Sequence, residues 1–439
     1  MSFSSCVEFP LWAGPGCGDP VAEVSPVFLQ RVLDSAMSDA VPVDPVDLVD
    51  LVHGCSPGCI GAPPPGDPAP VFLLCGDRSR DDLRGGSVHV LDSGSTADCL
   101  FRFKRTLDRM DVSSVRVFTT PRGRDRLALY ERWLFTAVYT FDYRVHALTC
   151  PSCAGPAHSD PPGEAVRVEE EVKALVQGLP ALGGGVRVLT SSLIPECFGH
   201  GFSTRSGGVT LIGTLSSLNL FSSSRRRDPE ALVQENRRRL ALHAGFHPLP
   251  LRLVKVDHGS RVWVVGQAEP DSYDAMVTDR VGVVLAAPGA DCMPILFADP
   301  RLKVIGAAHA GWKGTLMGVA MATVGAMVTE FGCRVSDIVV AMGPSVGACC
   351  FTLDRQQAED FYRVHRDCVP DPESVQPHVD LRLANRVLLQ RGGVLPGHIH
   401  DHKETQRCTS CHPEDFFSHV RDGQNFGTQV GFLWIRGTD

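Results

Sequence analysis

The sequence predicts a mixed α/β protein that combines a larger C-terminal domain with a smaller N-terminal α/β domain. Apolar runs of strand length alternate with helical patterns over residues 71–149, and segments rich in Pro and Gly flank that stretch. From residue 186 onward, apolar runs are longer and end at polar residues. We therefore expect an irregular segment at 1–70, a small α/β domain at 71–149, a linker and helix at 150–184, and the main domain at 185–439.

The N-terminal elements follow from apolar spacing and from the turn residues between them. The expected helices cover 27–37, 44–52, 97–110, 126–141 and 164–179, and the expected strands cover 71–75, 88–91 and 115–119. Cys150-Pro-Ser-Cys153, with His158 nearby, invites a zinc interpretation. One Cys-x-x-Cys without a second pair favours two loop thiols instead.

The C-terminal elements are more regular and include three apolar runs that end at polar residues. The expected strands cover 186–193, 251–256, 262–265, 281–287, 295–298, 304–308, 335–342 and 429–435, and the expected helices cover 228–245, 316–331 and 379–390. We expect 262–265 to pair with 251–256, because the two runs are close in sequence. The helix at 228–245 begins with Asp228-Pro229, which suits an N-cap followed by the first helical residue.

Composition excludes several classes of protein. The 439 residues carry a net charge of −8 and give a pI near 6.0, so no general basic surface for nucleic acid is expected. Sixteen cysteines are too sparse for a disulfide scaffold. No apolar run approaches the roughly 20 residues that span a bilayer, and the N-terminus lacks the pattern of a signal peptide. We expect a cytoplasmic protein with mostly reduced thiols.

Three candidate metal ligands stand at predicted strand ends: His258, Cys292 and His309. Their spacings of 34 and 17 residues mean that only the fold can bring them together. A thiolate and two imidazoles suit zinc, and three protein ligands leave a position for water or substrate. The alternative for each residue alone is a buried cysteine or a satisfied histidine. Cys292 is also a candidate nucleophile, with His309 or His258 as its base.

Two further stretches are candidates for anion binding. Gly311 and Gly314 flank Lys313 at the predicted start of a helix, where free backbone N–H groups and a positive charge would face a ligand. Arg205 lies in a loop that reads Ser-Thr-Arg-Ser-Gly-Gly. The alternative is an ordinary glycine turn and a surface arginine.

A late group of histidines and cysteines also resembles a metal cluster. Its members are His398, His400, His402, Cys408, Cys411 and His412. The Cys-x-x-Cys-His string matches a c-type haem attachment motif, but without a signal peptide we expect a structural or surface role.

A series of motifs then gives a specific resemblance over about 185–439. The motifs occur in one order: FSTRSGGVT, SLNL, VKVDHGSRV, DAMVTDRVGVVLAAPGADCMPILFAD, AAHAGWKGT, AMGPSVGACCF and CTSCHPEDFFSHVRD. The series resembles the purine nucleoside phosphorylase family long labelled polyphenol oxidase or laccase-domain. That resemblance implies a YfiH-like multi-layer catalytic domain with mixed sheets. Vertebrate members carry a similar N-terminal extension, so residues 1–184 resemble the family by architecture more than by motif.

The resemblance implies roles for individual residues. The family's metal-site residues correspond to His258, Cys292 and His309, and its substrate-pocket positions correspond to Arg205 and Asn219. Its late arginine corresponds to Arg421, and the turn residues Gly311 and Lys313 are expected to bind substrate as well. The sequence departs from the family pattern at Val256-Asp257, where the pattern has Gln-Val, and at His419-Val420, where the pattern has Tyr-Arg.

The resemblance also implies an activity. Family members carry out phosphorolysis of adenosine, inosine, guanosine and S-methyl-5′-thioadenosine, and deamination of adenosine, which implies one zinc ion per site and phosphate as co-substrate. Similar vertebrate proteins are associated with fatty acid synthase, with peroxisomal, nuclear or endoplasmic-reticulum locations, and with purine and macrophage metabolism in innate immunity. Two alternatives are a copper-dependent polyphenol oxidase and a non-enzymatic metabolic scaffold. The copper alternative lacks the His-Cys-His link and the repeated His-x-His pairs of multicopper sites.

Overall fold

A computed structural model describes residues 7–8, 48–53, 71–75, 88–119, 121–145, 161–400, 403 and 405–437. The chain divides into two compact units. The N-terminal unit comprises Met1–Leu179 and Ser222–Leu232, and the C-terminal unit comprises Pro180–Phe221 and Val233–Asp439. Among the described residues, no helix combines the length and the apolar character needed to cross a membrane.

The N-terminal unit contains a parallel sheet of six strands in which β1 pairs with β2 and the remaining order is β4-β3-β2-β5-β6. Helix α2 packs its apolar face inward, with Phe103 and Leu107 fully buried. The elements are β1 (Val7–Glu8), β2 (Leu48–His53), β3 (Val71–Cys75), β4 (Val88–Asp92), α2 (Thr96–Met110), β5 (Ser114–Thr119), α3 (Pro121–Leu134), β6 (Thr140–Val145) and α4 (Pro161–Gly178).

The C-terminal unit contains two sheets, ordered β7-β8-β17-β12-β9 and β10-β11-β14-β13-β15-β16. Its first elements are β7 (Val188–Leu189), β8 (Phe198–Ser203), α5 (Glu230–Ala244), β9 (Leu251–Leu253), β10 (Val262–Val264), β11 (Ala275–Thr278), β12 (Val284–Gly289), β13 (Met293–Asp299) and β14 (Val304–Ala310). The rest are α6 (Trp312–Leu316), α7 (Val319–Phe331), η2 (Val335–Asp337), β15 (Val339–Met342), α8 (Arg355–Val364), η3 (Arg366–Cys368), α9 (Leu381–Arg391), η4 (Pro396–His398), β16 (Ile399–His400), α10 (His419–Asp422) and β17 (Gln429–Ile435).

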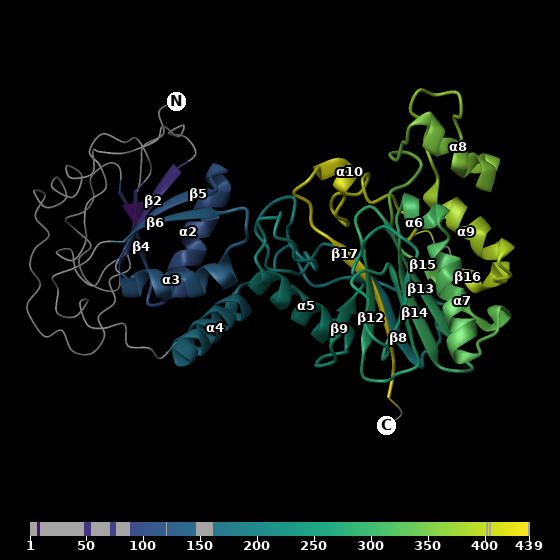
Figure 1. The fold of residues 1–439 in the computed structure, drawn as a ribbon, viewed down its shortest axis with the longest axis horizontal. Coiled ribbons are helices and arrows are strands. Elements are labelled where there is room, and N and C mark those ends of the chain that lie inside the picture. Colours follow the sequence, from purple (N-terminus) through teal and green to yellow (C-terminus); the bar gives the residue numbers. More distant parts are fainter. Residues whose placement is uncertain are drawn as a thin grey trace, which may run out of the picture. The chain divides into compact units, whose positions relative to one another are not determined.

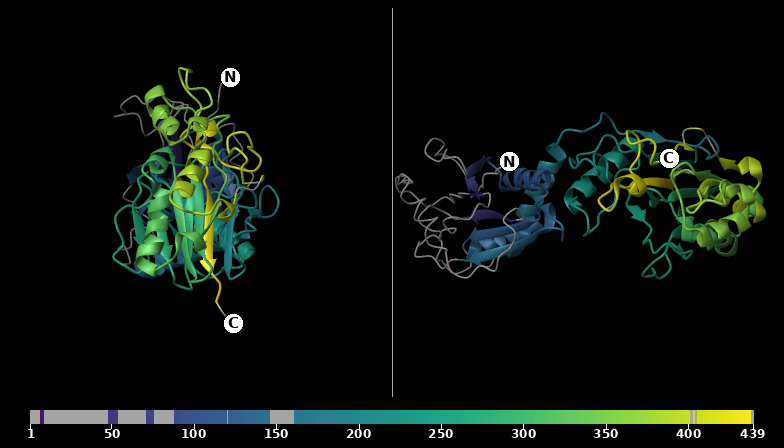
Figure 2. Two further views of the ribbon diagram at one scale, coloured as in Figure 1. Left: turned by 90° about the vertical axis from the view of Figure 1, so that its right-hand side faces the viewer. Right: turned by 90° about the horizontal axis from the view of Figure 1, so that it is seen from above.

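The two sheets of this unit pack face to face and are covered by helices on their outer faces (Figure 1). Because successive side chains on a strand alternate in direction, Ile295 and Phe297 of β13 pack toward α7, α8 and α9, whereas Leu296 packs against the other sheet. Leu285 of β12 also enters the layer between the sheets, and Val284 faces α5. The helices and strands of these layers can also be followed in the two views of Figure 2.

Burial on both faces explains why the central strands were predictable. All seven residues of β13 and all seven of β14 are buried, so each reads as a continuous apolar run. The closing strand β17 matches its predicted bounds. The predicted mixed α/β fold is confirmed.

Several predicted elements are wrong or displaced. Residues 44–52 do not form a helix, because Leu48–His53 is strand β2, paired with β1, β3 and β5. The helix expected at 126–141 ends at Leu134, and β6 begins at Thr140. The run at 335–342 opens with a 3-10 turn, so β15 begins only at Val339. The helix expected at 27–37 lies outside the described residues.

Two further differences affect the candidate site. Strand β10 pairs in parallel with β11 rather than with β9, which pairs with β12 instead. The helix expected at 316–331 is two helices, because Gly318 has φ of 79° and interrupts the helical path between α6 and α7. As a result α6 is a short helix that begins immediately after Gly311.

A candidate metal centre at the strand ends

Three segments of the C-terminal unit bring His258, Cys292 and His309 together. His258 lies in the loop after β9, Cys292 lies between β12 and β13, and His309 is next to last in β14. The antiparallel register pairs Pro294 with His309, so the start of β13 and the end of β14 meet. One potential ligand atom from each of the three side chains lies within 4.8 Å of the others. The two imidazole rings are 5.2 Å apart, edge to face.

Asp274 fixes one of these imidazoles from behind. Its Oδ1 lies 2.8 Å from His309 Nδ1, so Nε2 is the ring nitrogen of His309 that remains for a ligand. The same carboxylate accepts hydrogen bonds from the backbone N–H groups of Asp257, His258 and Gly259, at 3.2, 3.2 and 2.8 Å. One buried carboxylate thereby orients His309 and the loop that carries His258.

Electrostatics favour a thiolate at Cys292. Burial opposes the charged thiol, but the charge of His309 and hydrogen bonds from both histidines outweigh it and lower the pKa of Cys292 to about 6. Burial opposes an imidazolium at His309, yet Cys292 and Asp274 raise the pKa of His309 to about 9. Burial likewise opposes ionisation of Asp274, but His309, Asp257 and Gly259 hold the pKa of that carboxyl far below its usual range.

The donor set fits a divalent metal. A thiolate with two imidazoles, one of them backed by a carboxylate, is an arrangement that zinc uses in catalytic sites. Three protein donors leave a position for water or substrate. The same His₂Cys donors also occur at blue-copper sites, so the donors alone do not fix which metal binds.

The backbone around the centre leaves room for the donor side chains to lie close together. A Cβ atom built on Gly311 would lie 2.9 Å from Cys292 Sγ and 3.3 Å from His258 Cδ2, so only glycine fits without displacement. His258 itself has φ of 63°, a left-handed conformation that is uncommon outside glycine. Such a conformation in a ligand-bearing loop is typical of a functional site.

Lys313 lies on α6, two residues after the N-cap Gly311. Its side chain is exposed, and its Nζ lies 5.3 Å from the centroid of the Trp312 ring. Gly314 is also needed for close packing, because a Cβ there would come within 2.8 Å of Gly259 O. The predicted glycine turn therefore allows the α6 turn to approach the His258 loop and the metal donors.

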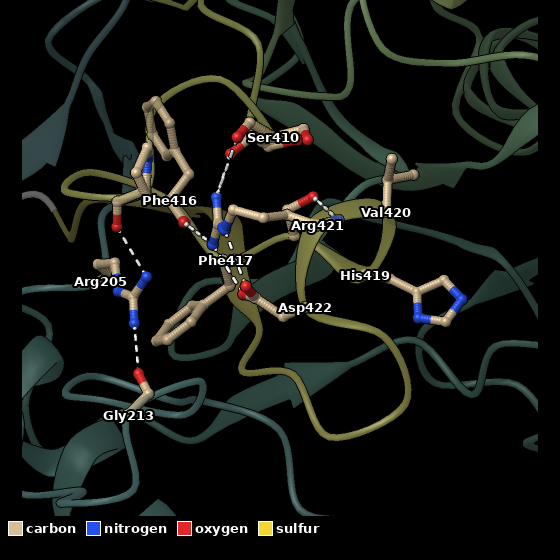
Figure 3. Close-up of polar contacts among 12 residues, drawn as sticks. Arg205, Gly213, Ser410, Phe416, Phe417, His419, Val420, Arg421 and Asp422 are labelled. Carbon is tan, nitrogen blue, oxygen red and sulfur yellow. Dashed lines mark hydrogen bonds and ion pairs between the residues drawn. The ribbon is translucent and has the colours of Figure 1, made fainter.

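Arg205 is held firmly within the protein (Figure 3). Its guanidinium donates to the carbonyl oxygens of Ser216 at 2.7 Å, Pro413 at 2.7 Å and Gly213 at 2.8 Å. It also lies over the Phe417 ring, 4.8 Å from the centroid. In this structure Arg205 joins the loop that follows β8 to the segment before α10.

Arg421 is held by contacts within its own segment (Figure 3). It donates to the carbonyl oxygens of Thr409 at 2.9 Å and Phe416 at 3.0 Å. It also forms an ion pair with the neighbouring Asp422 at 2.7 Å. The side chain thus folds the segment 409–422 back upon itself.

Asn219 is fully buried and braces two segments. Its Oδ1 accepts a hydrogen bond from the Thr428 N–H at 3.0 Å, and its Nδ2 donates to Phe221 O at 3.2 Å. Asn219 thereby joins the segment that follows Arg205 to the segment before β17.

Two carboxylates were missed by sequence reasoning. Asp274 lies in the predicted motif DAMVTD, but the sequence gives no spacing signal that links it to His309. Asp291 directly precedes Cys292, and its carboxylate accepts from Thr409 Oγ1 at 2.5 Å and from the Val420 N–H at 2.7 Å. The sequence did hold a signal for Asp291, because an apolar run stops shortly before it and an acidic residue directly precedes Cys292.

The late histidine and cysteine cluster is divided in the structure. Cys408 and Cys411 gather with Cys349 and Cys350, and that group contains no histidine among the described residues. His412 bonds through Nδ1 to Cys408 O at 2.9 Å. His398 ends a 3-10 turn and His400 lies in β16, while His402 lies outside the described residues, as do Cys150, Cys153 and His158.

Comparison with known proteins gives consistent matches. The family model described as multi-copper polyphenol oxidoreductase laccase matches residues 199–436. The chain is 48% identical over 358 residues to purine nucleoside phosphorylase LACC1 of Mus musculus, covering 80% of this chain and 83% of the relative. It is 33% identical over 241 residues to adenosine deaminase RL5 from an unknown prokaryotic organism, covering 52% of this chain and 90% of the relative.

A solved structure shows a similar fold. The hypothetical protein YfiH of Bacillus licheniformis matches with a TM-score of 0.50 and 28% identity. The match covers 54% of this chain and 93% of YfiH. The layered arrangement of the main domain is therefore shared with an experimentally determined fold.

Proposed function

We propose that this chain, which belongs to the family described as multi-copper polyphenol oxidoreductase laccase, is a metal-dependent purine nucleoside phosphorylase. The observation that carries the proposal is the convergence of His258, Cys292 and His309 beside a carboxylate. Strong similarity to a relative named as a purine nucleoside phosphorylase supports the same conclusion. We propose adenosine, inosine, guanosine and S-methyl-5′-thioadenosine as substrates, with phosphate as the second substrate.

The proposed reaction breaks the glycosidic bond of the nucleoside. A phosphate oxygen forms a bond to C1′ of the ribose, and the electron pair of the C1′–N9 bond leaves with the purine, which takes up a proton. Lys313 is proposed to hold the phosphate by charge, beside the backbone of Gly311. Arg205, Asn219 and Arg421 are proposed to shape the wall against which the nucleoside binds.

His258, Cys292 and His309 are the residues that would hold zinc. Zinc, when bound, supplies a Lewis acid and lowers the pKa of a bound water toward neutrality. Asp274 keeps the Nδ1 proton of His309 in place, so that Nε2 stays directed to the centre. Because Cys292 is readily ionised, a thiolate is available for metal binding near neutral pH.

Adenosine deamination is a second candidate activity at the same centre. It is favoured by the similarity to a protein named as an adenosine deaminase. In that reaction water adds to C6 of adenine and ammonia leaves, which gives inosine. Phosphorolysis requires phosphate and deamination does not, so the two activities can be separated by omitting phosphate.

Purified protein incubated with adenosine, with and without phosphate, tests both activities. Chromatography should show adenine, hypoxanthine and ribose 1-phosphate only with phosphate, and inosine as the product without phosphate. Cys292→Ala and His309→Ala should abolish both products while the chain remains folded. Cys197→Ala, at a half-buried thiol outside the centre, is the matched control and should retain turnover. Retained turnover in Cys292→Ala would refute the metal-site mechanism.

A copper oxidase acting on phenols is the alternative that the His₂Cys donor set and the family description suggest. Metal analysis and a visible spectrum of the purified protein distinguish the two. We expect a colourless zinc protein. An intensely blue, copper-loaded protein that oxidises phenols would replace the nucleoside proposal.

A further inference from the structure

Four cysteines from two distant segments meet outside the candidate centre. Cys349 and Cys350 lie in the turn that follows β15, and Cys408 and Cys411 lie between β16 and α10. Their four sulfur atoms all lie within 4.8 Å of one another. We propose that these four thiols hold a second, structural metal ion of the zinc type that clamps the two segments together.

The sulfur spacing is that of ligands around a metal. A tetrahedral zinc site with Zn–S bonds of about 2.3 Å places its sulfur atoms about 3.8 Å apart. The sulfur of Cys411 lies 3.5 Å from that of Cys349 and 3.3 Å from that of Cys350. A disulfide would need about 2.05 Å, and all four residues are free thiols in the structure.

The donor set is that of a closed structural site. Four thiolates with no carboxylate and no open position are typical of structural zinc, whereas the His258 centre has three donors and a vacancy. Two of the thiols form a Cys-x-x-Cys pair, Cys408-Thr-Ser-Cys411, which is the usual half of such a site. The second pair is two adjacent residues, so spacing rules alone do not detect it.

The backbone brings the two segments into contact at this point. Ser345 forms a bridge with Cys408, and the Thr409 N–H donates to Ser345 O at 3.1 Å. A Cβ atom on Gly347 would lie 3.3 Å from both Cys349 Sγ and Cys408 Cβ. Glycine at 347 therefore allows the close approach that four sulfur ligands require.

The clamp would act on a segment that is hydrogen-bonded to the neighbour of Cys292. Thr409, between the two clustered cysteines, donates to Asp291, the neighbour of Cys292. In the same segment, Arg205 donates a hydrogen bond to the carbonyl oxygen of Pro413, and Arg421 donates one to that of Thr409. A metal at the four thiols would therefore hold the segment that these side chains brace, without contacting the His258 centre.

Metal content of the full chain, purified with excess zinc under reducing conditions, tests the proposal. Wild type should carry about two zinc ions per chain, and Cys292→Ala and Cys411→Ser should each carry about one. Cys292→Ala keeps the four thiols, so its remaining zinc is independent of the proposed enzymatic function. Cys368→Ser, at a buried thiol outside both clusters, should keep about two and is the matched control.

Cobalt in place of zinc gives a second measurement. Cobalt-loaded Cys292→Ala should show the sulfur-to-metal charge-transfer and tetrahedral bands of a four-thiolate site. Adding Cys411→Ser to that variant, at an exposed thiol, should remove the spectrum. A Cys411→Ser chain with as much zinc as wild type, a Cys292→Ala chain with none, or a disulfide from Cys411 to Cys349 or Cys350 in the reduced preparation would each overturn the proposal.

Discussion

Gly311 is the residue whose missing side chain makes room for the candidate centre. Its backbone passes directly beside Cys292 and His258, and it is also the N-cap of α6. The sequence assigned this glycine to an anion-binding turn. The structure adds that the same glycine leaves space for two of the three candidate metal donors.

Gly311→Ala should weaken metal binding. The new Cβ would lie 2.9 Å from Cys292 Sγ, and such crowding typically costs about 1–3 kcal/mol, or roughly 5- to 150-fold in affinity. Competition with a chelator would measure the change. Gly178→Ala, where nothing lies within 4 Å of the added atom, should leave affinity unchanged. Wild-type affinity in Gly311→Ala would show that the donors lie farther from this backbone than described.

Asp274→Asn should lower metal affinity and turnover while the fold remains. An amide keeps the shape of the side chain but removes the charge that orients His309, and loss of such a partner typically costs about 10- to 100-fold. Chelator competition and kcat measured at saturating metal would separate the two effects. Asp271→Asn, at an exposed carboxylate in the same loop, is the control. An unchanged affinity would mean that Asp274 only stabilises the loop.

At the scale of elements, β8 is joined to the end of β7 by a neutral histidine. The Ser191 N–H donates to His200 Nε2 at 2.8 Å, which requires that nitrogen to be unprotonated. Burial lowers the pKa of His200 to about 4, and the nearby Arg436 and His400 act in the same direction. His200, His400 and Arg436 also border a cavity of about 830 Å³.

This histidine predicts a loss of stability in acid. Between about pH 6.5 and pH 4 the unfolded chain binds a proton at His200 and the folded chain does not. The contribution of His200 to the free energy of unfolding is therefore fully present above about pH 6.5. It decreases as the pH falls toward 4, by at most about 3 kcal/mol. Amide hydrogen exchange in β7 and β8 should accelerate as pH falls, after correction for intrinsic exchange rates. His200→Gln, which retains an acceptor, should flatten that dependence, whereas exposed His243→Gln should not. An identical pH profile in His200→Gln would refute the assignment.

The elements also show what sequence can and cannot predict. Strands β13, β14 and β17 were predictable because burial on both faces leaves an unbroken apolar run. Strand β2 was not, because the spacing of DPVDLVDLV fits a helix and only its strand partners decide otherwise. The break at Gly318 depends on a positive φ. Glycine allows this conformation, but a glycine in the sequence does not by itself predict it.

The residues of the candidate site likewise include some that the sequence predicts and some that it does not. His258, Cys292 and His309 were found because a thiol and imidazoles at strand ends form a recognisable set of donors. Asp274 was not found, because its link to His309 depends on the antiparallel pairing of β11 with β14. Cys349 and Cys350 were likewise not linked to Cys408, since only the folded chain brings the two segments together.

For the whole molecule, the division into units separates the candidate centre from the N-terminal sheet. All three candidate metal donors and Asp274 belong to the C-terminal unit. The insertion Ser222–Leu232 belongs to the N-terminal unit, where Arg227 bonds to Asp111 at 2.8 Å and to Val112 O at 3.1 Å.

A chain that lacks residues 1–179 should keep its metal and its turnover but lose solubility. The centre is intact in that chain, whereas residues 222–232 lose the partners of Arg227. Metal content, nucleoside turnover per mole and light scattering would be compared with those of the full chain. Replacing Arg227 by Gln in the truncated chain should change scattering alone. Loss of metal on truncation would mean that the N-terminal unit contributes to the centre.

The wide spacing of the three candidate donors along the chain would couple metal supply to the stability of the C-terminal unit. Because His258, Cys292 and His309 are neighbours only after that unit has formed, an ion held by all three would bind the native state and not the unfolded chain. Free ion at a hundred times its dissociation constant would then add about 2.7 kcal/mol to the stability of the unit. Under the proposed function, a shortage of the metal would leave the unit open to proteases more often.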